Sequence, residues 1–569
     1  MQTLEFLLRP RSRWVICWSL FLGAVGIVAV EAWRGFNLPE RRDGNWGHAT
    51  IDFGGQWLMG RMIVEGQGRH LYLRNYLRPV IQHGYPAGGE SPEAEKTDAE
   101  ALMGWLAGTD DPKAPKVIAS LLSPLAVSNS LDETIVLASA ETTWTEERLE
   151  HVTAPRIGGA LYPPIHAFYY APLALLRPQV AYRVGQGFVL ALAFFAGWVI
   201  ERITEGRVWW PVGSLFVFMF PGFSGCIALG QNGMFTLTLV LLGWWQLMRG
   251  REVLAGLCWG LLAFKPVWAA ALFLVPLLTT RWRMAASMAF AGLVQIALTL
   301  PIVGWESWRT WLEVGQEAAQ EYKRQENWII LSRDLLGIPR RWLLTFDGAL
   351  AKDLIWTTGD SPATGDGTAE NPWDHPLLSI LGWGLWATVL AITLLVVWRC
   401  RRRRKELTGL FPTFVLIGAI FTCYHFMYYD VVVAGLPMLL LFTEPRRYLQ
   451  VHFWRRPLGS AACSKEMLPY YQPSLADLTP PPMPLLPGGR RPRWVVAPMP
   501  PLLLFLLLVV PALNCILDPT YHFPPWETFL LLFLWAWCGY QLWRGANHRV
   551  TEKWRTAGVS RLVEVPPAG

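Results

Sequence analysis

The chain has 569 residues, of which 52% are hydrophobic and only 16% are charged. Soluble domains average about 25% charged residues, so this composition excludes an ordinary soluble protein and indicates an integral membrane protein. The net charge of +7 is ordinary for a membrane protein with basic cytoplasmic loops, and it gives no reason to expect nucleic-acid binding.

Apolar runs of helical length recur along the chain and are interrupted by short charged turns. This pattern predicts an all-α polytopic membrane protein with about 10–12 transmembrane segments, whereas a β-barrel would show short alternating segments. The expected spans are residues 14–30, 180–200, 209–229, 234–248, 252–264, 266–280, 284–303, 376–399, 409–425, 430–443, 498–516 and 525–543.

Two apolar segments have more than one interpretation. The run 14–30 follows three arginines, and no small-residue cleavage site comes after it, so we expect a retained first span rather than a signal peptide. Segment 162–176 ("YPPIHAFYYAPLALL") would invert the orientation of every later span if it crossed the membrane. We therefore predict an interfacial or partly buried helix after Tyr162 and the two prolines, with Tyr169 and Tyr170 at the membrane interface.

Basic residues gather in one set of connections, including 249–252, 281–283 and 399–405 ("RCRRRRK"). The positive-inside rule places these connections and both chain ends in the cytoplasm. Residues 31–178 and 304–374 then form two large extracytoplasmic loops of a protein in a bacterial-type inner membrane.

Three parts are expected along the chain. Residues 1–443 form the membrane domain, and residues 444–497 form a Pro- and Arg-rich cytoplasmic linker of extended or disordered type. Residues 498–569 form a C-terminal transmembrane hairpin with a basic tail.

Several polar residues interrupt apolar sequence on the predicted outer side. Asp52 lies near the start of the first outer loop, and Gln231 and Asn232 form a turn in "GQNG". Lys265, in "FKP", sits inside an apolar stretch that must double back there. A charged side chain at membrane depth costs roughly 2.5–3.5 kcal/mol on insertion scales, and such residues are usually functional.

Further polar residues fall on the same side. Asn327 and Arg333 belong to "ENWIILSRDLL" in the second outer loop, and His425 and Asp430 belong to the outer turn "YHFMYYD". Arg156 precedes the segment that begins at Tyr162. Convergence of these residues on one face is the main reason to expect a site.

Each residue also has a structural explanation. Asp52, Gln231, Asn232, Asn327 and Asp430 can cap helices or turns. Likewise, Lys265 can snorkel to the interface, Arg156 can be a surface charge, and His425 can be a packing residue.

The sequence contains no motif that indicates another type of enzyme chemistry. The sequence has no P-loop, no Rossmann glycine pattern after a strand, no HExxH and no GxSxG. The eight cysteines are scattered without CxxC spacing, so neither a disulfide framework nor a zinc site is expected.

The order and spacing of several weak motifs resemble glycosyltransferase family 87, whose members are often described as α-1,2-mannosyltransferases. These motifs are "IDFGGQW", "YPP", "ALGQNGMFTLTLVLLGWW", "LAGLCWGLLAFKPVWAAALFLVPLL" and "YHFMYYD". The resemblance covers roughly residues 10–445 and implies a GT-C fold with a polyprenyl-phosphate sugar as donor. The loop 85–155, the linker and the last two spans have no counterpart in it.

The resemblance implies that the carboxylate of the first outer loop is the general base, and by position this is Asp52. Transfer would occur with inversion to a hydroxyl of a glycan, lipid or protein acceptor, with mannose or a similar sugar favoured. Positive charge at the leaving phosphate would come from Lys265, His425, Arg156 and Arg333. Hydrogen bonds to phosphate or sugar would come from Gln231, Asn327 and Tyr162, with Asn232 and Asp430 as further members. No metal or other cofactor is expected, because no DxD-like pair lies beside Asp52.

Two other functional classes stay open as alternatives to an enzyme. A transporter or flippase for lipid-linked saccharides would share the polar mid-membrane residues and broken helices. The long first outer loop with its membrane-adjacent aspartate, and the lack of an inverted repeat, favour an enzyme. The third interpretation is a non-catalytic scaffold of the cell envelope.

Overall fold

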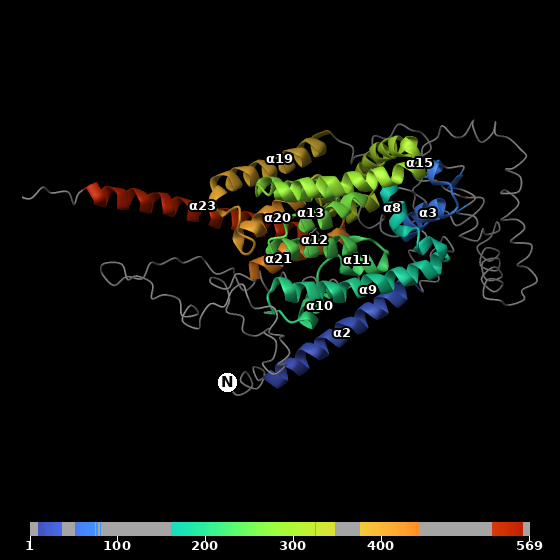
Figure 1. Ribbon diagram of the computed structural model, residues 1–569, viewed down its shortest axis with the longest axis horizontal. Coiled ribbons are helices and arrows are strands. Elements are labelled where there is room, and N and C mark those ends of the chain that lie inside the picture. Colours follow the sequence, from blue (N-terminus) through green and yellow to red (C-terminus); the bar gives the residue numbers. More distant parts are fainter. Residues whose placement is uncertain are drawn as a thin grey trace, which may run out of the picture.

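The computed structural model describes residues 10–36, 52–73, 76, 77, 80, 161–206, 208–324, 326–346, 376–442 and 526–561. These parts contain helices and no β-strand, and the helices lie side by side in an elongated bundle (Figure 1). The all-α prediction is therefore confirmed. The loop 85–155, the linker 444–497, the span 498–516 and Arg156 lie outside the described residues.

The α-helices are, in chain order, α2 (Pro10–Phe36), α3 (Asp52–Val64), α8 (Pro164–Tyr170), α9 (Pro178–Ile203), α10 (Trp210–Phe218), α11 (Phe223–Ala228), α12 (Gly233–Met248), α13 (Glu252–Gly260), α14 (Pro266–Leu278), α15 (Trp282–Arg324), α16 (Glu326–Leu331), α17 (Ile338–Phe346), α19 (Pro376–Arg399), α20 (Leu410–Thr422), α21 (Gly435–Phe442) and α23 (Trp526–Arg561). Short 3-10 helices are η2 (Gly68–His70), η3 (Leu173–Leu175), η4 (Leu261–Phe264), η6 (Arg401–Arg403) and η7 (Tyr428–Ala434).

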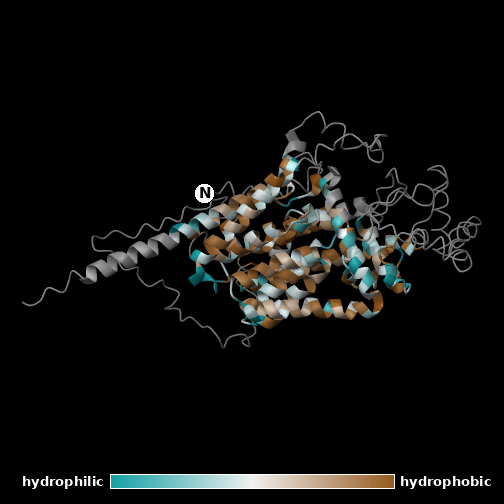
Figure 2. Cartoon of the chain, turned by 90° about the horizontal axis from the view of Figure 1, so that it is seen from above, coloured by the Kyte–Doolittle hydropathy of each residue, from teal (hydrophilic) through white to brown (hydrophobic). Residues whose placement is uncertain are grey.

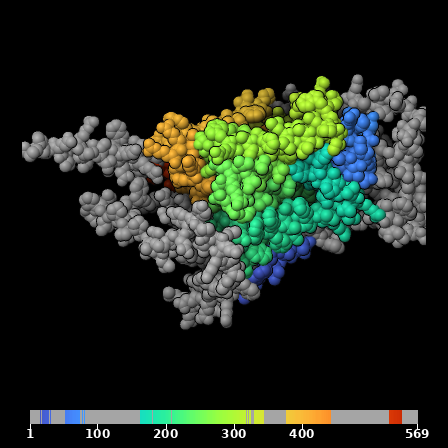
Figure 3. All heavy atoms as spheres, viewed as in Figure 1, coloured from blue at the N-terminus to red at the C-terminus, as the bar shows by residue number. Residues whose placement is uncertain are grey.

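Three helical segments among the described residues are long and apolar enough to cross a membrane: Val180–Ile203, Trp282–Gln316 and Pro376–Arg399. Shorter apolar helices pack beside them, and hydrophobic residues dominate the middle of the bundle (Figure 2). In the space-filling view the helices from α9 to α15 form one continuous surface (Figure 3). These features confirm a helical membrane protein.

Helices α13, α14 and α15 run forward, back and forward again. Gly256 packs against Met284 and Gly260 packs against Met288, so α13 and α15 run in the same direction. The chain returns through α14, and Arg281 at its far end lies 2.9 Å from Glu252 at the start of α13. The reversal predicted between the two apolar halves is confirmed.

The reversal occurs at Lys265, which has a non-helical backbone (φ −133°, ψ 74°). Pro266 follows as the first residue of α14. Proline suits the first helical position because its missing N–H has no intrahelical partner there, and it disfavours a helical conformation in the preceding residue. The Lys-Pro sequence therefore ends one helix and begins the next at Lys265.

The predicted span 209–229 is wrong as a single helix. It divides into α10 and α11 around Gly222, whose φ of +88° favours glycine. Gly222 also lies close to another part of the chain, because a Cβ there would be 2.5 Å from the Tyr428 carbonyl oxygen. Close approach of two backbones explains the break.

The predicted second outer loop begins as helix rather than irregular loop. Helix α15 kinks at Gly304 (φ 73°, ψ 168°), close to the predicted end of the span at residue 303, and then continues to Arg324. Similarly, the predicted span 430–443 begins with the seven-residue 3-10 helix η7.

Segment 162–176 folds as expected into a short helix that does not span the bundle. Helix α8 has seven residues, whereas a transmembrane helix needs about 20. Pro163 precedes the helix and Pro164 is its first residue. The buried side of α8, including Ile165 and His166, packs against α3.

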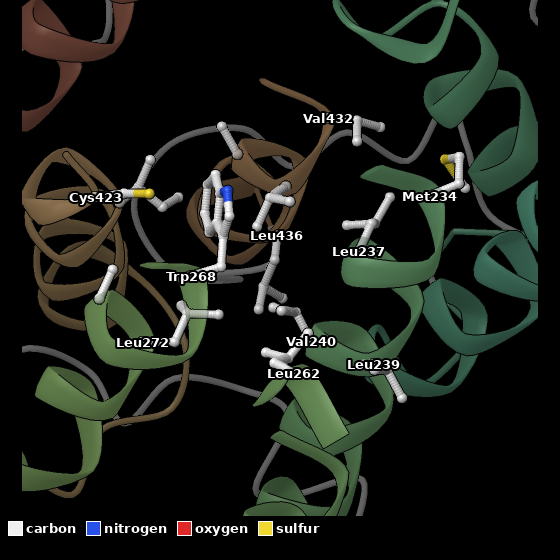
Figure 4. Packing of buried hydrophobic residues seen from close by; sticks show 14 of the residues in the cluster. Met234, Leu237, Leu239, Val240, Leu262, Trp268, Leu272, Cys423, Val432 and Leu436 are labelled. Carbon is white, nitrogen blue, oxygen red and sulfur yellow. The ribbon is translucent and has the colours of Figure 1, made fainter. Parts of the chain in front are cut away.

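The interior is filled by apolar side chains from helices that are distant in sequence. Leu237, Leu262, Trp268, Leu272 and Leu436 point toward one another from α12, η4, α14 and α21 (Figure 4). This core lies next to the residues at the start of α12 and α14, and it therefore fixes where their polar side chains can go.

The predicted span 525–543 belongs to α23, which runs in the same direction as α19. Trp535 Nε1 of α23 donates to Thr393 Oγ1 of α19 at 3.2 Å. Further along both helices, the Arg399 guanidinium of α19 lies 4.3 Å above the Trp543 ring of α23. Trp535 also stacks on Phe414 of α20. The C-terminal helix is thus part of the bundle.

Candidate active site

A hydrogen-bond network begins at Asp52, the partly exposed first residue of α3. Gln231 Nε2 donates to Asp52 Oδ1 at 2.9 Å, and the Tyr162 hydroxyl donates to Gln231 Oε1 at 2.9 Å. Because the Gln231 oxygen is used by Tyr162, its NH₂ group faces the carboxylate. The position of Asp52 at a helix N-terminus also favours negative charge.

Gln56 lies one helical turn after Asp52 and connects it to the interior. Its Nε2 donates to the Asp52 carbonyl at 3.1 Å and to the Gly230 carbonyl at 3.2 Å. Its Oε1 contacts Asn232 Nδ2 at 3.3 Å and His166 Nε2 at 3.2 Å. Because both amide hydrogens go to carbonyl groups, the oxygen is the acceptor, and His166 must carry its hydrogen on Nε2.

The network ends at a buried ion pair. Lys265 Nζ donates to Asn232 Oδ1 at 3.1 Å and lies 2.5 Å from Asp430 Oδ1. Lys265 is 3% exposed and Asp430 is fully buried. Removing two charges from water is costly, and close pairing with added hydrogen bonds offsets that cost. The Tyr429 ring lies 5.1 Å from the ammonium and adds a cation–π contact.

The capping explanation fails for two of these residues. Asn232 precedes α12, yet its side chain makes no capping hydrogen bond and binds Gln56 and Lys265 instead. Asp430 lies inside η7, and its Oδ1 binds Lys265. The turn and the helix break therefore direct polar groups toward one another.

Aromatic rings enclose the network. The His166 ring is buried and stacks on Tyr162 at 4.0 Å and on Tyr170 at 4.7 Å between ring centroids. His425 stacks on Tyr322 at 4.4 Å. These stacks fix the planes of both imidazole rings.

His425 lies between α20 and η7. Although part of the residue remains accessible, burial lowers the pKa of the His425 imidazole to about 3, and the charge of Lys265 adds to this effect. The imidazole is therefore neutral near pH 7, and Lys265 supplies the positive charge.

The structure brings most of the predicted site residues into one network: Asp52, Tyr162, Gln231, Asn232, Lys265 and Asp430. Arg333 instead lies 3.2 Å from Glu527 of α23, with its guanidinium above the Tyr428 ring. Asn327 belongs to α16, but its side chain is outside the described residues, as is Arg156.

Gln56 and His166 were not among the predicted site residues. Gln56 is four residues after Asp52 in α3, and residues four apart share one face of a helix, so this spacing was the available signal. Tyr162 precedes α8, so helical spacing gave no such signal for His166. Within the described parts of the chain, no group of three or more His, Cys, Asp or Glu residues could hold a metal ion. Independence from metal stays a prediction.

The arrangement offers two chemical capabilities. A partly exposed carboxylate in a fixed orientation can accept a proton. A buried ammonium group can stabilise an anion that develops in a low-dielectric environment. Gln231 orients the carboxylate, and hydrogen bonds from the Asp52 backbone carbonyl through Gln56 and Asn232 lead to Lys265.

Comparison with known proteins gives a match to one family. The sequence profile of glycosyltransferase family 87 matches residues 160–424. No curated protein and no solved structure matches the chain. The matched part contains Tyr162, Gln231 and Lys265, whereas Asp52 precedes it and Asp430 follows it. The match supports the predicted membership of glycosyltransferase family 87, a family of membrane glycosyltransferases.

Proposed function

We propose that this membrane glycosyltransferase moves a hexose or pentose, with a mannose-like sugar favoured, from a polyprenyl-phosphate donor to an acceptor hydroxyl. The observation that carries the proposal is the network from the partly exposed Asp52 to the buried Lys265. A general base at the accessible end and a cation at the buried end suit a donor with an anionic leaving group.

Asp52 takes the proton of the acceptor hydroxyl while the acceptor oxygen attacks the anomeric carbon. The bond between the anomeric carbon and the phosphate oxygen breaks, and its electron pair leaves with the polyprenyl phosphate. Attack and departure on opposite sides invert the anomeric centre. Because phosphate leaves as an anion without protonation, one carboxylate suffices, whereas a glycosidase needs two.

Lys265 stabilises the charge that develops on the leaving phosphate. The partner of Lys265 in the structure is Asp430, so an incoming phosphate shares the ammonium with that carboxylate. Tyr162, Gln231 and Asn232 provide hydrogen bonds to phosphate or sugar, and neutral His425 is a further donor. Arg156 and Asn327 remain proposed contributors.

The proposed site faces the extracytoplasmic side. It lies at the end of the bundle where α13 turns into α14. Arg281, at the other end of α14, binds Glu252 and the Lys405 carbonyl beside the basic run 399–405. Since basic connections favour the cytoplasm, the network belongs on the opposite side.

The test is transfer by the purified full-length protein in detergent. Radiolabelled polyprenyl-phosphate sugars and nucleotide sugars are offered separately with membrane acceptors, and the configuration of the product linkage is measured. We expect transfer from the lipid-linked donor with inversion. Transfer from the nucleotide sugar alone would contradict the proposal. Movement of lipid-linked sugar across proteoliposomes without transfer would favour the transporter.

A further inference from the structure

The first turn of the C-terminal helix α23 holds the segment that carries Arg333. Glu527 Oε2 lies 3.2 Å from Arg333 Nε, and the two side chains are only 7% and 6% exposed. The Thr528 hydroxyl donates to the Arg333 carbonyl at 3.0 Å. Helix α23 therefore fixes both the side chain and the backbone of residue 333.

The same segment is tied to the outer turn that leads into η7. Arg333 N donates to the Phe426 carbonyl at 2.6 Å, and Ser332 forms a β-bridge with Met427. The Arg333 guanidinium lies 5.1 Å above the ring of Tyr428, the first residue of η7. Two residues further on, Asp430 binds Lys265.

The start of η7 is also confined by residues of α11, α12 and the turn before α11. A Cβ at Gly233 would overlap the Tyr429 carbonyl oxygen, and Cys226 Sγ donates to the same oxygen at 3.3 Å. Gly222 is equally close to Tyr428. Since packed segments cannot deform continuously, a shift of η7 would move both Asp430 and the Asn232 turn.

We infer that α23 is a positioning element of the active site, which acts through the buried Glu527–Arg333 pair to hold η7 and, with it, Asp430 and Lys265. Helix α23 lies outside the residues that match the family, yet it contacts the segment next to the network. Glu527 and Arg333 are positioning residues that do not touch substrate. This inference rests on the proposed function for its effect on turnover.

If α23 served only as a membrane anchor, it would need different contacts. It would need the apolar contacts lower in the helix, such as Trp535 against Phe414, and it would not need a buried charge at residue 527. A buried carboxylate is costly unless it is paired, so its presence opposite Arg333 argues for a defined role.

Full-length variants separate positioning from stability. Glu527→Gln removes the charge, and the exchange Arg333→Glu with Glu527→Arg restores a pair of opposite sign. Trp535→Phe is the matched control on the same helix. We expect Glu527→Gln to lower kcat about 10-fold with little change in KM, and the exchange to recover most of it. An equal loss of kcat in Trp535→Phe, at equal thermal stability, would overturn the inference.

Thiol labelling gives a readout that does not depend on transfer. Cys226 contacts η7 and Cys423 Sγ donates to the His425 carbonyl, whereas Cys400 Sγ donates to the Leu542 carbonyl near the middle of α23. Labelling is followed peptide by peptide with a maleimide and mass spectrometry.

In Glu527→Gln we expect Cys226 and Cys423 to label about 10-fold faster, while Cys400 keeps its wild-type rate. Unchanged labelling of Cys226 and Cys423 would overturn the positioning role. Equal acceleration of all three would also overturn it, because α23 would then have detached as a whole. If labelling responds as expected but no variant or wild type transfers sugar, the proposed function fails and the positioning role stands.

Discussion

Gln231 donates a hydrogen bond to the Asp52 carboxylate across 179 positions of sequence. The two residues come from the start of α3 and from the turn between α11 and α12, and Tyr162 fixes the glutamine amide from its other side. The orientation of the proposed base is therefore set by a residue inside the family match.

Replacing Gln231 tests whether that orientation matters for turnover. A hydrogen bond to a charged group contributes about 1.5–3 kcal/mol, so Gln231→Leu is expected to lower kcat roughly 10- to 100-fold. Gln186→Leu is the control, because Gln186 is also buried and donates to the Ile227 carbonyl outside the network. Equal kcat losses in the two variants would mean that Gln231 acts only through packing.

Variants of the Lys265–Asp430 pair separate its effect on stability from its effect on sugar transfer. Removing one partner of a buried ion pair leaves an unpaired charge and costs about 3–5 kcal/mol, so Lys265→Met alone should lower the unfolding temperature in detergent. The double variant Lys265→Met with Asp430→Leu should recover stability while transfer stays lost.

The control for this pair is Arg281→Met, whose partner Glu252 lies at the other end of α14. That pair is more exposed, and exposed pairs contribute about 0–1 kcal/mol. Transfer by the double Lys265 and Asp430 variant at the wild-type rate would contradict the role assigned to the ammonium group.

The lowered pKa of His425 predicts the direction of a pH effect. An unfolded histidine takes up a proton below about pH 6.5, whereas burial keeps the folded His425 neutral until about pH 3. The unfolded state therefore binds more protons in this window, and the free energy of unfolding falls as pH drops from 6.5 toward 3.

His425→Gln removes that titration and keeps a neutral donor. We expect its unfolding temperature to fall less than that of the wild type between pH 7.5 and pH 5. We also expect activity at pH 7 to stay within roughly 10-fold, because the ring is neutral there. An identical pH dependence of unfolding in both proteins would be incompatible with the low pKa.

Gly233 is a close-packing position beside η7. Gly233→Ala would place a methyl group on the Tyr429 carbonyl oxygen, so the backbone must shift, and a loss of about 1–3 kcal/mol is expected. Gly187→Ala is the control, since a Cβ there meets nothing within 4 Å. Thermal unfolding of both variants measures the difference; a neutral Gly233→Ala would contradict the packing.

Much of the fold follows from the length of the apolar runs in the sequence. Residues 376–399 form a helix with the predicted bounds, because the run is uninterrupted and flanked by polar sequence. The break at Gly222 was missed because it depends on contact with Tyr428, about 200 positions away. The helix beyond Gly304 was missed because that part is too polar to resemble a span.

The site was predictable where polar residues interrupt apolar sequence. Lys265, Gln231 and Asp430 are conspicuous for that reason, and the structure includes them in one hydrogen-bond network. The pairing of these residues is not visible in the sequence: Gln56 binds Asn232 only because α3 packs against the start of α12. Likewise, Arg333 was expected to face phosphate, and only the tertiary structure reveals its contact with Glu527.

The most direct measurement compares Asp52→Asn with wild type in transfer from a radiolabelled polyprenyl-phosphate sugar. Glu65→Gln is the matched control, because Glu65 is an exposed carboxylate just beyond the other end of α3. General-base catalysis contributes about 10²- to 10⁴-fold, so we expect Asp52→Asn to lose at least 100-fold in kcat while Glu65→Gln keeps wild-type turnover and both proteins unfold at similar temperatures. Transfer by Asp52→Asn at the wild-type rate would contradict the account.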